Sequence, residues 1–182
     1  MAATIITPET KGHDESTLDS GKGTMERELE KHARDTDPTQ AQLFKMQTRL
    51  PKEGRAAALL GATDRMWVNL KAYAEGGENT LHAHANEDHT FIILQGQASF
   101  FGSEGKIATL GRNEGILLPR GVAYHFHAEE DGEPLVILRM GCVVDASKPV
   151  WDRKGSDGGH ISGSSAENKS KPTVFYEDKI YE

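Results

Sequence analysis

Cysteine is almost missing from the chain, since Cys142 is the only one among 182 residues. An intrachain disulfide is therefore excluded, and so is a metal site built from paired thiolates. Any bound metal must use histidine nitrogens and side-chain oxygens as ligands. Cys142 ends the apolar run LVILRMGCVV, where a free cysteine usually packs as a small hydrophobic residue. We therefore predict a buried thiol with no catalytic role.

The chain also lacks long apolar runs and clusters of basic residues. No stretch approaches 18 consecutive apolar residues, and the N-terminus has neither the basic nor the apolar segment of a secretory signal. The formal net charge is -7 and the pI is near 5.6, which argues against a surface that neutralises phosphates. We expect a soluble cytoplasmic protein with no membrane and no nucleic-acid partner.

Aromatic residues and valine are missing from residues 1–43, which contain no Phe, Tyr, Trp or Val. Such a segment buries little surface on its own, so we predict an N-terminal arm, partly helical or flexible. Within the arm, Thr24 to Ala33 begins with a residue that favours the N-cap position and continues with helical spacing, which predicts a short helix.

From Arg65 onward the chain consists of short apolar or alternating runs, such as MWVNLKAYA, TFIILQGQASFF and PLVILRMGCVV. Glycine and acidic clusters separate the runs at the spacing of an antiparallel barrel or sandwich. We predict an all-β domain over residues 44–151. After it, residues 152–182 are rich in glycine, serine and charge, which indicates a loop-rich tail. The final TVFYEDKIYE regains β-type residues and is expected to return to the barrel edge or to a neighbouring subunit.

Five of the eight histidines lie between positions 82 and 127. His82 and His84 are two residues apart, so on a strand they point to the same face. His89 begins the next apolar run, and a tight turn at residues 85–88 would bring it beside them. Three imidazoles on one side of a divalent metal leave other positions open for water or substrate. The competing interpretation is a set of surface histidines on a polar turn.

The stretch GGENTLHAHANEDHTFIILQG resembles the first motif of the cupin family, with Gly76, His82, His84, His89 and Gly96 in register. Most cupins carry Glu where this chain has His89, and the sequence is similar to three-histidine variants among cupin dioxygenases. The resemblance covers roughly residues 65–145. It implies a double-sheet jelly-roll barrel.

The second cupin motif is matched only in part by NEGILLPRGVAYHFH. Asn113 stands at a glycine position, Pro119 and Gly121 match, and the ligand position falls on Tyr124. His125 follows one residue late, and neighbouring residues of a strand face opposite sides unless a bulge intervenes. Tyr124 and His125 therefore compete for a fourth metal position, with Tyr124 slightly favoured. His127 would share the face of His125, and we expect it to be solvent-exposed.

Three neutral imidazoles would leave a divalent metal with its full charge, which favours an anionic chelating substrate. The resemblance implies an Fe(II) dioxygenase that cleaves a C–C bond of an enolisable, dicarbonyl or phenolic compound. Mn, Ni or Zn would instead favour a lyase or isomerase. A non-enzymatic cupin that holds a metal or small ligand, and a structural dimer with a vestigial site, are the alternatives from other classes.

Several further residues are candidates around this site. Tyr124 is predicted to be the proton donor or oxyanion partner, against the alternative of an ordinary barrel aromatic. Arg139 interrupts an apolar run, and we predict that it points outward to an acidic neighbour in preference to binding a substrate carboxylate. The N-terminal arm and the final segment both need a partner surface, so a homodimer with exchanged strands is expected. Strand alternation predicts an apolar pocket lined by Trp67, Phe91, Ile93 and Phe126.

Overall fold

Antiparallel strands dominate the computed structural model of the chain, and of the residues that it describes, 53% form strands and 7% form helix. The structure describes residues 3–14, 24–37, 39–74, 78–129, 132–148 and 153–182. Its one helix is α1 (Thr24–Asp35). The strands, in chain order, are β1 (Ala3–Ile6), β2 (Lys11–Gly12), β3 (Ala41–Phe44), β4 (Thr48–Glu53), β5 (Arg55–Ala62), β6 (Met66–Tyr73), β7 (His82–His84), β8 (Glu87–Gln95), β9 (Ala98–Gly102), β10 (Gly105–Leu110), β11 (Gly115–Leu118), β12 (His125–Ala128), β13 (Leu135–Val143), β14 (Arg153–Gly155) and β15 (Val174–Tyr181).

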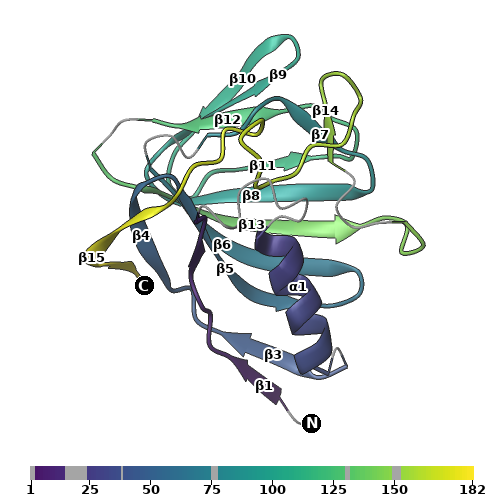
Figure 1. Cartoon of the computed structure of the whole chain (residues 1–182), viewed down its shortest axis with the longest axis vertical. Coiled ribbons are helices and arrows are strands. Elements are labelled where there is room, and N and C mark those ends of the chain that lie inside the picture. Colours follow the sequence, from purple (N-terminus) through teal and green to yellow (C-terminus); the bar gives the residue numbers. More distant parts are fainter. Residues whose placement is uncertain (1–2, 15–23, 38, 75–77, 130–131, 149–152) are drawn as a thin grey trace.

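Two sheets face each other around the main core. One has six strands in the order β11-β8-β13-β6-β5-β2, and the other has three in the order β10-β9-β12. Their inward side chains meet in a single apolar cluster, to which Phe91, Ile93 and Ile137 come from the larger sheet and Phe100 and Phe126 from the smaller one. This arrangement confirms the predicted all-β double-sheet jelly roll (Figure 1).

The outer face of the six-stranded sheet is covered by the last strand of the chain. β15 pairs with β4, and Tyr176 and Tyr181 pack against a second buried cluster that includes Leu60, Leu70 and Val136. TVFYEDKIYE therefore returns to the same domain, which was one of the two alternatives for this segment.

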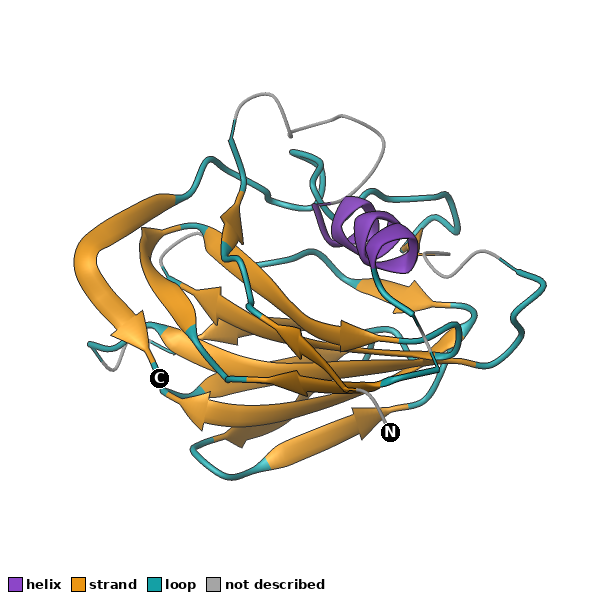
Figure 2. Cartoon of the chain, turned by 90° about the horizontal axis from the view of Figure 1, so that it is seen from below, coloured by secondary structure: helices purple, strands orange, loops and turns teal. Residues whose placement is uncertain are grey.

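Helix α1 lies across the inner face of β5 and β6, at the open side of the sheet (Figures 1 and 2). Met25 is buried against Ala57, Leu59 and Trp67, because the helix presents an apolar stripe to these strands. The short N-terminal helix is confirmed, and it begins at Thr24 as predicted. β2 joins the six-stranded sheet beside β5. The boundaries at residues 43 and 151 stay predictions, and position 151 lies outside the described residues.

The segment before β15 is an ordered loop with buried polar side chains. Ser164 and Asn168 are at most 1% exposed, although the composition of this predicted loop-rich tail favours exposure to solvent. Arg55 of β5 explains the difference, because its guanidinium donates hydrogen bonds to the carbonyl oxygens of Gly163 (2.8 Å) and Glu78 (3.0 Å) and to the Ser170 hydroxyl. Hydrogen bonds to this one buried cation therefore hold the loop in place, although the loop makes few apolar contacts.

The N-terminal arm and the C-terminal segment are hydrogen-bonded to each other. The His13 amide donates to Thr173 Oγ1 at 2.8 Å, and the Thr173 amide donates to the His13 carbonyl oxygen at 2.7 Å. In the described part of the chain, no helix has the length and apolar character needed to cross a membrane.

Cys142 is exposed, so the prediction of a buried thiol is wrong. The reason is the alternation of β13, in which Gly141 and Val143 are buried on either side of it. The apolar run around Cys142 therefore belongs to a strand whose two faces differ in burial at this position.

Candidate metal centre

The histidine cluster is built at the turn between β7 and β8. His82 and His84 share one face of β7, and after Ala85 and Asn86 the chain enters β8, where Glu87 and His89 occupy alternate positions. All four of these side chains are at most 3% exposed. The tight turn therefore brings donor groups from two strands together inside the protein.

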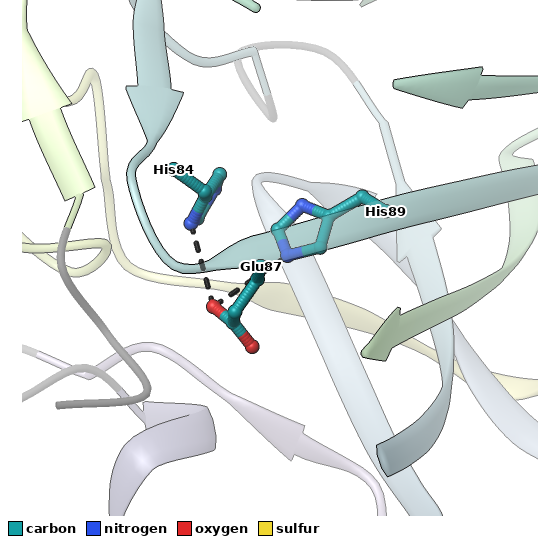
Figure 3. A group of neighbouring side chains, drawn as sticks. All are labelled: His84, Glu87 and His89. Carbon is teal, nitrogen blue, oxygen red and sulfur yellow. Dashed lines mark ion pairs between the residues drawn. The ribbon is translucent and has the colours of Figure 1, made fainter. Parts of the chain in front are cut away.

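Three of the side chains form a compact donor set. His84 Nδ1 and His89 Nε2 each lie 3.6 Å from Glu87 Oε2, and the three donor atoms lie within 4.8 Å of one another. In Figure 3 the Glu87 carboxylate lies between the two imidazoles, with His84 coming from β7 and the other two from β8. Such a mixture of imidazole and carboxylate ligands suits a divalent transition metal.

The hydrogen-bonding state of these atoms fits a bound ion. His84 Nδ1, Glu87 Oε2 and His89 Nε2 are buried and have no hydrogen-bond partner among the described residues, and the same is true of His82 Nε2. Buried polar atoms are normally paired, so four such atoms in one cluster need an explanation. His82 Nδ1 faces the Thr80 carbonyl oxygen at 2.7 Å, which assigns the ring proton to that nitrogen and leaves Nε2 as a lone-pair donor.

Burial keeps these imidazoles neutral. It is the main cause that lowers the pKa of His82, His84 and His89 well below the ordinary value, and nearby arginines add to the effect. A neutral imidazole is the form that binds a metal.

The sequence prediction missed Glu87. Burial raises the pKa of this carboxyl to about 7, while the Trp67 indole Nε1–H donates to Glu87 Oε1 at 2.6 Å and favours the ionised form. The indole fixes one oxygen and leaves Oε2 directed at the two imidazoles. The available signal was strand alternation, because position 87 lies two residues before His89 and so shares its face.

Tyr124 lies at the cluster and His125 does not. The backbone of Tyr124 is paired with that of His82, and its hydroxyl is 3.4 Å from His89 Nδ1. The ring of His125 stacks on Phe101 at a centroid distance of 5.1 Å. Pairing of β12 with β9 continues without a bulge from His125 onward, so His125 faces the opposite side, as an uninterrupted strand requires. The predicted metal ligand His125 is therefore not brought to the other histidines.

His127 shares the face of His125, as the alternation required. Its side chain is 37% exposed, and its Nδ1 lies 3.5 Å from Glu78 Oε1. This histidine is thus at the surface beside an acidic residue, away from the cluster.

Arg139 points into the protein, so the prediction that it faces outward is wrong. Its side chain is 4% exposed, and its Nη2 lies 3.0 Å from His89 Nδ1, 3.4 Å from His84 Nε2 and 3.5 Å from the Tyr124 hydroxyl. Arg139 is paired with Phe91 of β8 in the sheet and shares its inward face. The guanidinium carbon lies 5.0 Å from the centre of the Trp67 ring, which favours the charge at this position.

Glu87 and Arg139 therefore contact opposite nitrogens of the same two imidazoles. A guanidinium only donates hydrogen bonds, so His89 Nδ1 is the acceptor while Arg139 contacts it, and the ring proton lies on Nε2. A metal at Nε2 needs the other tautomer, with the proton on Nδ1. Metal binding at this histidine thus requires Arg139 to release Nδ1, and the nearby Tyr124 hydroxyl can then accept the Nδ1 proton in a hydrogen bond.

The four predicted pocket residues are packed core side chains. Trp67, Phe91, Ile93 and Phe126 are at most 2% exposed. Phe91 and Phe126 pack edge to face at 6.0 Å, and Trp67 packs edge to face on His89 at 5.4 Å. They support the cluster from its apolar side, and none of them lines the cavity beside it.

Two positions of the cupin motifs have a backbone conformation with positive φ, which few residue types tolerate. Gly96 has a φ of 73°, and a side chain there would also approach the Leu135 backbone at 3.2 Å. Asn113, which stands at a glycine position of the second motif, has a φ of 67°. Asparagine tolerates this left-handed conformation better than other residues with a side chain. Gly76 lies outside the described residues.

Comparison with known proteins finds a family model that matches the central part of the chain. Residues 69–141 match the family model described as a cupin domain. Similar solved structures include KdgF from a Halomonas species (15% identity, TM-score 0.46, 52% of this chain and 84% of that chain). A cupin superfamily protein of Desulfitobacterium hafniense (18%, 0.46, 54% and 84%) and a Klebsiella pneumoniae protein with a double-stranded β-helix domain (17%, 0.47, 54% and 85%) are also similar. The search of curated proteins gave no match. The segment from residue 69 to residue 141, which contains His82, His84, Glu87 and His89, is therefore similar to a cupin domain.

Proposed function

We propose that the chain is a metal-dependent enzyme acting on a small chelating substrate, and that it is an Fe(II) dioxygenase cleaving a C–C bond of an enolisable, dicarbonyl or phenolic compound. The observation that carries the proposal is the set of four buried, unpaired donor atoms on His82, His84, Glu87 and His89. Burying these donor atoms without a partner costs free energy, and a bound metal ion is expected to offset this cost.

The ligand chemistry favours iron among the divalent metals. Two histidines and one carboxylate on one face are the ligand set of non-haem Fe(II) oxygenases, and His84, Glu87 and His89 supply it. The carboxylate lowers the net charge of the site below that expected for three histidines alone. When bound, the metal supplies Lewis-acid polarisation of chelating oxygens and, if it is Fe(II), reactivity toward O₂.

The remaining side chains of the site orient the metal ligands and bind the substrate. Trp67 holds Glu87 through its indole N–H, and the buried aromatic residues below exclude water from the imidazoles. Burial raises the pKa of Tyr124, so its hydroxyl stays protonated at neutral pH and is available to donate a proton or a hydrogen bond to a substrate oxygen. Arg139, beside both imidazoles, offers a positive charge to an anionic substrate.

Metal analysis tests this function directly. Protein purified without added metal is expected to contain iron near one per chain, and His84→Ala is expected to lose it. Oxygen consumption with enolisable, dicarbonyl and phenolic compounds then tests the reaction. Stoichiometric iron without oxygen consumption would reject the dioxygenase and leave a protein that holds metal or ligand without turnover. Absence of any stoichiometric metal would reject the metal-dependent function as a whole.

A lyase or isomerase is the second candidate, because a protonated Tyr124 and the Arg139 cation lie within 3.5 Å of each other at the cluster. Together they are suited to stabilise an enolate and return a proton, which needs no O₂. Turnover without oxygen, with Mn, Ni or Zn in the protein, would favour this reaction over oxidative cleavage.

Tyr124→Phe is expected to reduce kcat by roughly 10²- to 10⁴-fold, because it removes the proton-donating hydroxyl and keeps the ring that packs among the aromatic residues. The measurement is kcat together with metal content, and the metal content is expected to stay at the wild-type value. Tyr176→Phe on the outer face is the matched control and should leave both quantities unchanged. Loss of metal in Tyr124→Phe would assign the hydroxyl to the ligand set instead.

We also propose a homodimer. β1 and β3 form a separate parallel pair that exposes Ile5 (77%), Leu43 (55%) and Phe44 (42%), and a two-stranded sheet of this size is only marginally stable alone. Light scattering is expected to give the mass of two chains. Ile5→Lys combined with Leu43→Lys should give one chain, whereas Ile107→Lys at another exposed isoleucine should not. A monomeric wild-type protein would contradict the proposal.

A further inference from the structure

A basic cavity of about 60 Å³ lies beside the histidine cluster and is lined by residues of the inner face of the six-stranded sheet, the start of α1 and the loop at residues 160–168. The charged side chains that line it are Lys11, Glu26, Arg55, Lys71, Arg139 and Arg153. Five basic side chains and one carboxylate thus line the cavity, in a chain whose formal net charge is -7, and among the described residues Lys11 is the only one of the five with an ion pair, which it forms with Glu9. The charge of this cavity is opposite to that of the protein as a whole.

The cations come from separate strands that converge on one space. Lys71 lies on β6 and Arg139 on β13, both on the inner face, and Arg153 lies on β14. Bringing unpaired like charges into an interior costs free energy unless something else is gained. Arg55 differs from these cations, because its guanidinium donates hydrogen bonds to the carbonyl oxygens of Glu78 and Gly163.

Lys11 pairs with Glu9, and Arg139 and Arg153 interact electrostatically with Glu87, but two observations indicate that the cavity keeps unused positive charge within the described part of the chain. Arg139 Nε and Arg153 Nη1 are buried without a hydrogen-bond partner there. Burial lowers the pKa of Lys71 well below its ordinary value, and Arg139 and Arg55 lower it further. The first residues of α1, from Thr24 to Glu26, also line the cavity, and a helix N-terminus adds partial positive charge.

We propose that this cavity binds a small dianion, carried as two carboxylates or as a phosphate group, and that this is the anionic part of the substrate of the neighbouring metal site. The proposal rests on the proposed function for its link to substrate. Arg139 provides the connection, because its Nη2 contacts His84 and His89 while its side chain also lines the cavity. A dianion there would pair with Arg139 Nε, Arg153 Nη1 and Lys71 and draw the guanidinium away from the imidazoles.

Anion binding to chelator-treated protein tests the cavity independently of the metal. Malonate, inorganic phosphate and acetate are titrated at constant ionic strength, and the melting temperature and calorimetric Kd are measured. Saturable stabilisation by malonate or phosphate is expected, with acetate weaker by at least about tenfold, since each additional charged hydrogen bond contributes about 1.5–3 kcal/mol. Malonate alone would identify a dicarboxylate, and phosphate alone a phosphate ester.

Lys71→Met gives two expected changes of opposite sign. Without an anion its melting temperature should rise, because an amine that is repelled by Arg139 and Arg55 is removed, and its Kd for the active dianion should increase by at least about tenfold. Lys71→Arg keeps the charge and should retain binding. Lys106→Met, at an exposed position of β10, is the control and should change neither quantity.

Three results would overturn the proposal: no saturable anion effect, equal effects of acetate and malonate, or unchanged dianion affinity in Lys71→Met. Because the titration uses metal-free protein, the outcome is separate from that of the metal analysis. A protein that binds the dianion but never holds metal would refute the proposed enzyme and keep the anion site.

Discussion

Glu87→Gln is expected to lower metal affinity at neutral pH by at least about 100-fold. Loss of a residue that only orients a metal ligand typically costs 10- to 100-fold, so loss of a charged ligand should cost at least the upper end of this range. Glutamine keeps the size of the side chain, and its amide oxygen can still accept the Trp67 N–H. The measurement is a competitive titration against a chromophoric chelator.

The same substitution should stabilise the metal-free protein above neutral pH. The Glu87 carboxyl has a pKa raised from 4.5 to about 7, so ionising it in the folded state costs about 3 kcal/mol by pH 8 relative to the unfolded chain. This destabilisation is absent below pH 4.5, develops as the pH rises toward 7 and is complete above it. Glutamine removes it, so the free energy of unfolding at pH 8 should increase.

Glu104→Gln, in the exposed turn before β10, is the matched control and should leave both metal affinity and stability unchanged. Wild-type metal affinity in Glu87→Gln would contradict the His84, Glu87 and His89 donor set. It would then favour the set of three histidines expected from the sequence, in which residue 87 has no part.

Gly141→Ala should destabilise the protein by about 3 kcal/mol or more, because a Cβ at this position would lie 2.3 Å from Trp67 ring atoms. For a chain of this length, that corresponds to a fall in Tm of roughly 6–12 °C. Displacing the indole would also disturb its hydrogen bond to Glu87, so metal affinity should fall together with stability. Thermal unfolding of the metal-free protein separates the two effects.

The neighbouring position provides the control for that substitution. Cys142→Ala changes an exposed side chain on the same strand and should shift Tm by less than about 1 °C. If Gly141→Ala melted with the wild-type protein, the close packing of Trp67 on β13 would be disproved, and with it the support that holds Glu87.

Much of the fold follows from local patterns in the sequence. Alternation from residue 87 to residue 93 fixes which face of β8 is buried, and the spacing of His82, His84 and His89 brings the imidazoles to one turn. These features depend on neighbours along the chain, so a single sequence contains them. Glu87 was accessible by the same argument, but the expected ligand spacing drew attention to position 89.

Arg139 and the loop at residues 160–168 could not be predicted in this way. Whether a cation in an apolar strand faces inward depends on which side chains of other segments surround it, and here these are Tyr124, His84 and His89. The burial of Ser164 and Asn168 likewise depends on Arg55, which is more than 100 residues away along the chain. Composition alone predicts that such polar residues are exposed to solvent.

The hydrogen bonds between His13 and Thr173 join positions 160 residues apart, and β2, α1 and the loop before β15 close over the barrel next to them. Contacts of such sequence separation form late and slowly, because a large loop must be ordered before they contribute free energy. The strands β5, β6, β8 and β13 all precede residue 173 in the chain, so their sheet can form before these contacts do. Contacts that form last are also expected to open first, so small molecules can enter and leave the ligand sites when the two segments separate while the barrel stays folded.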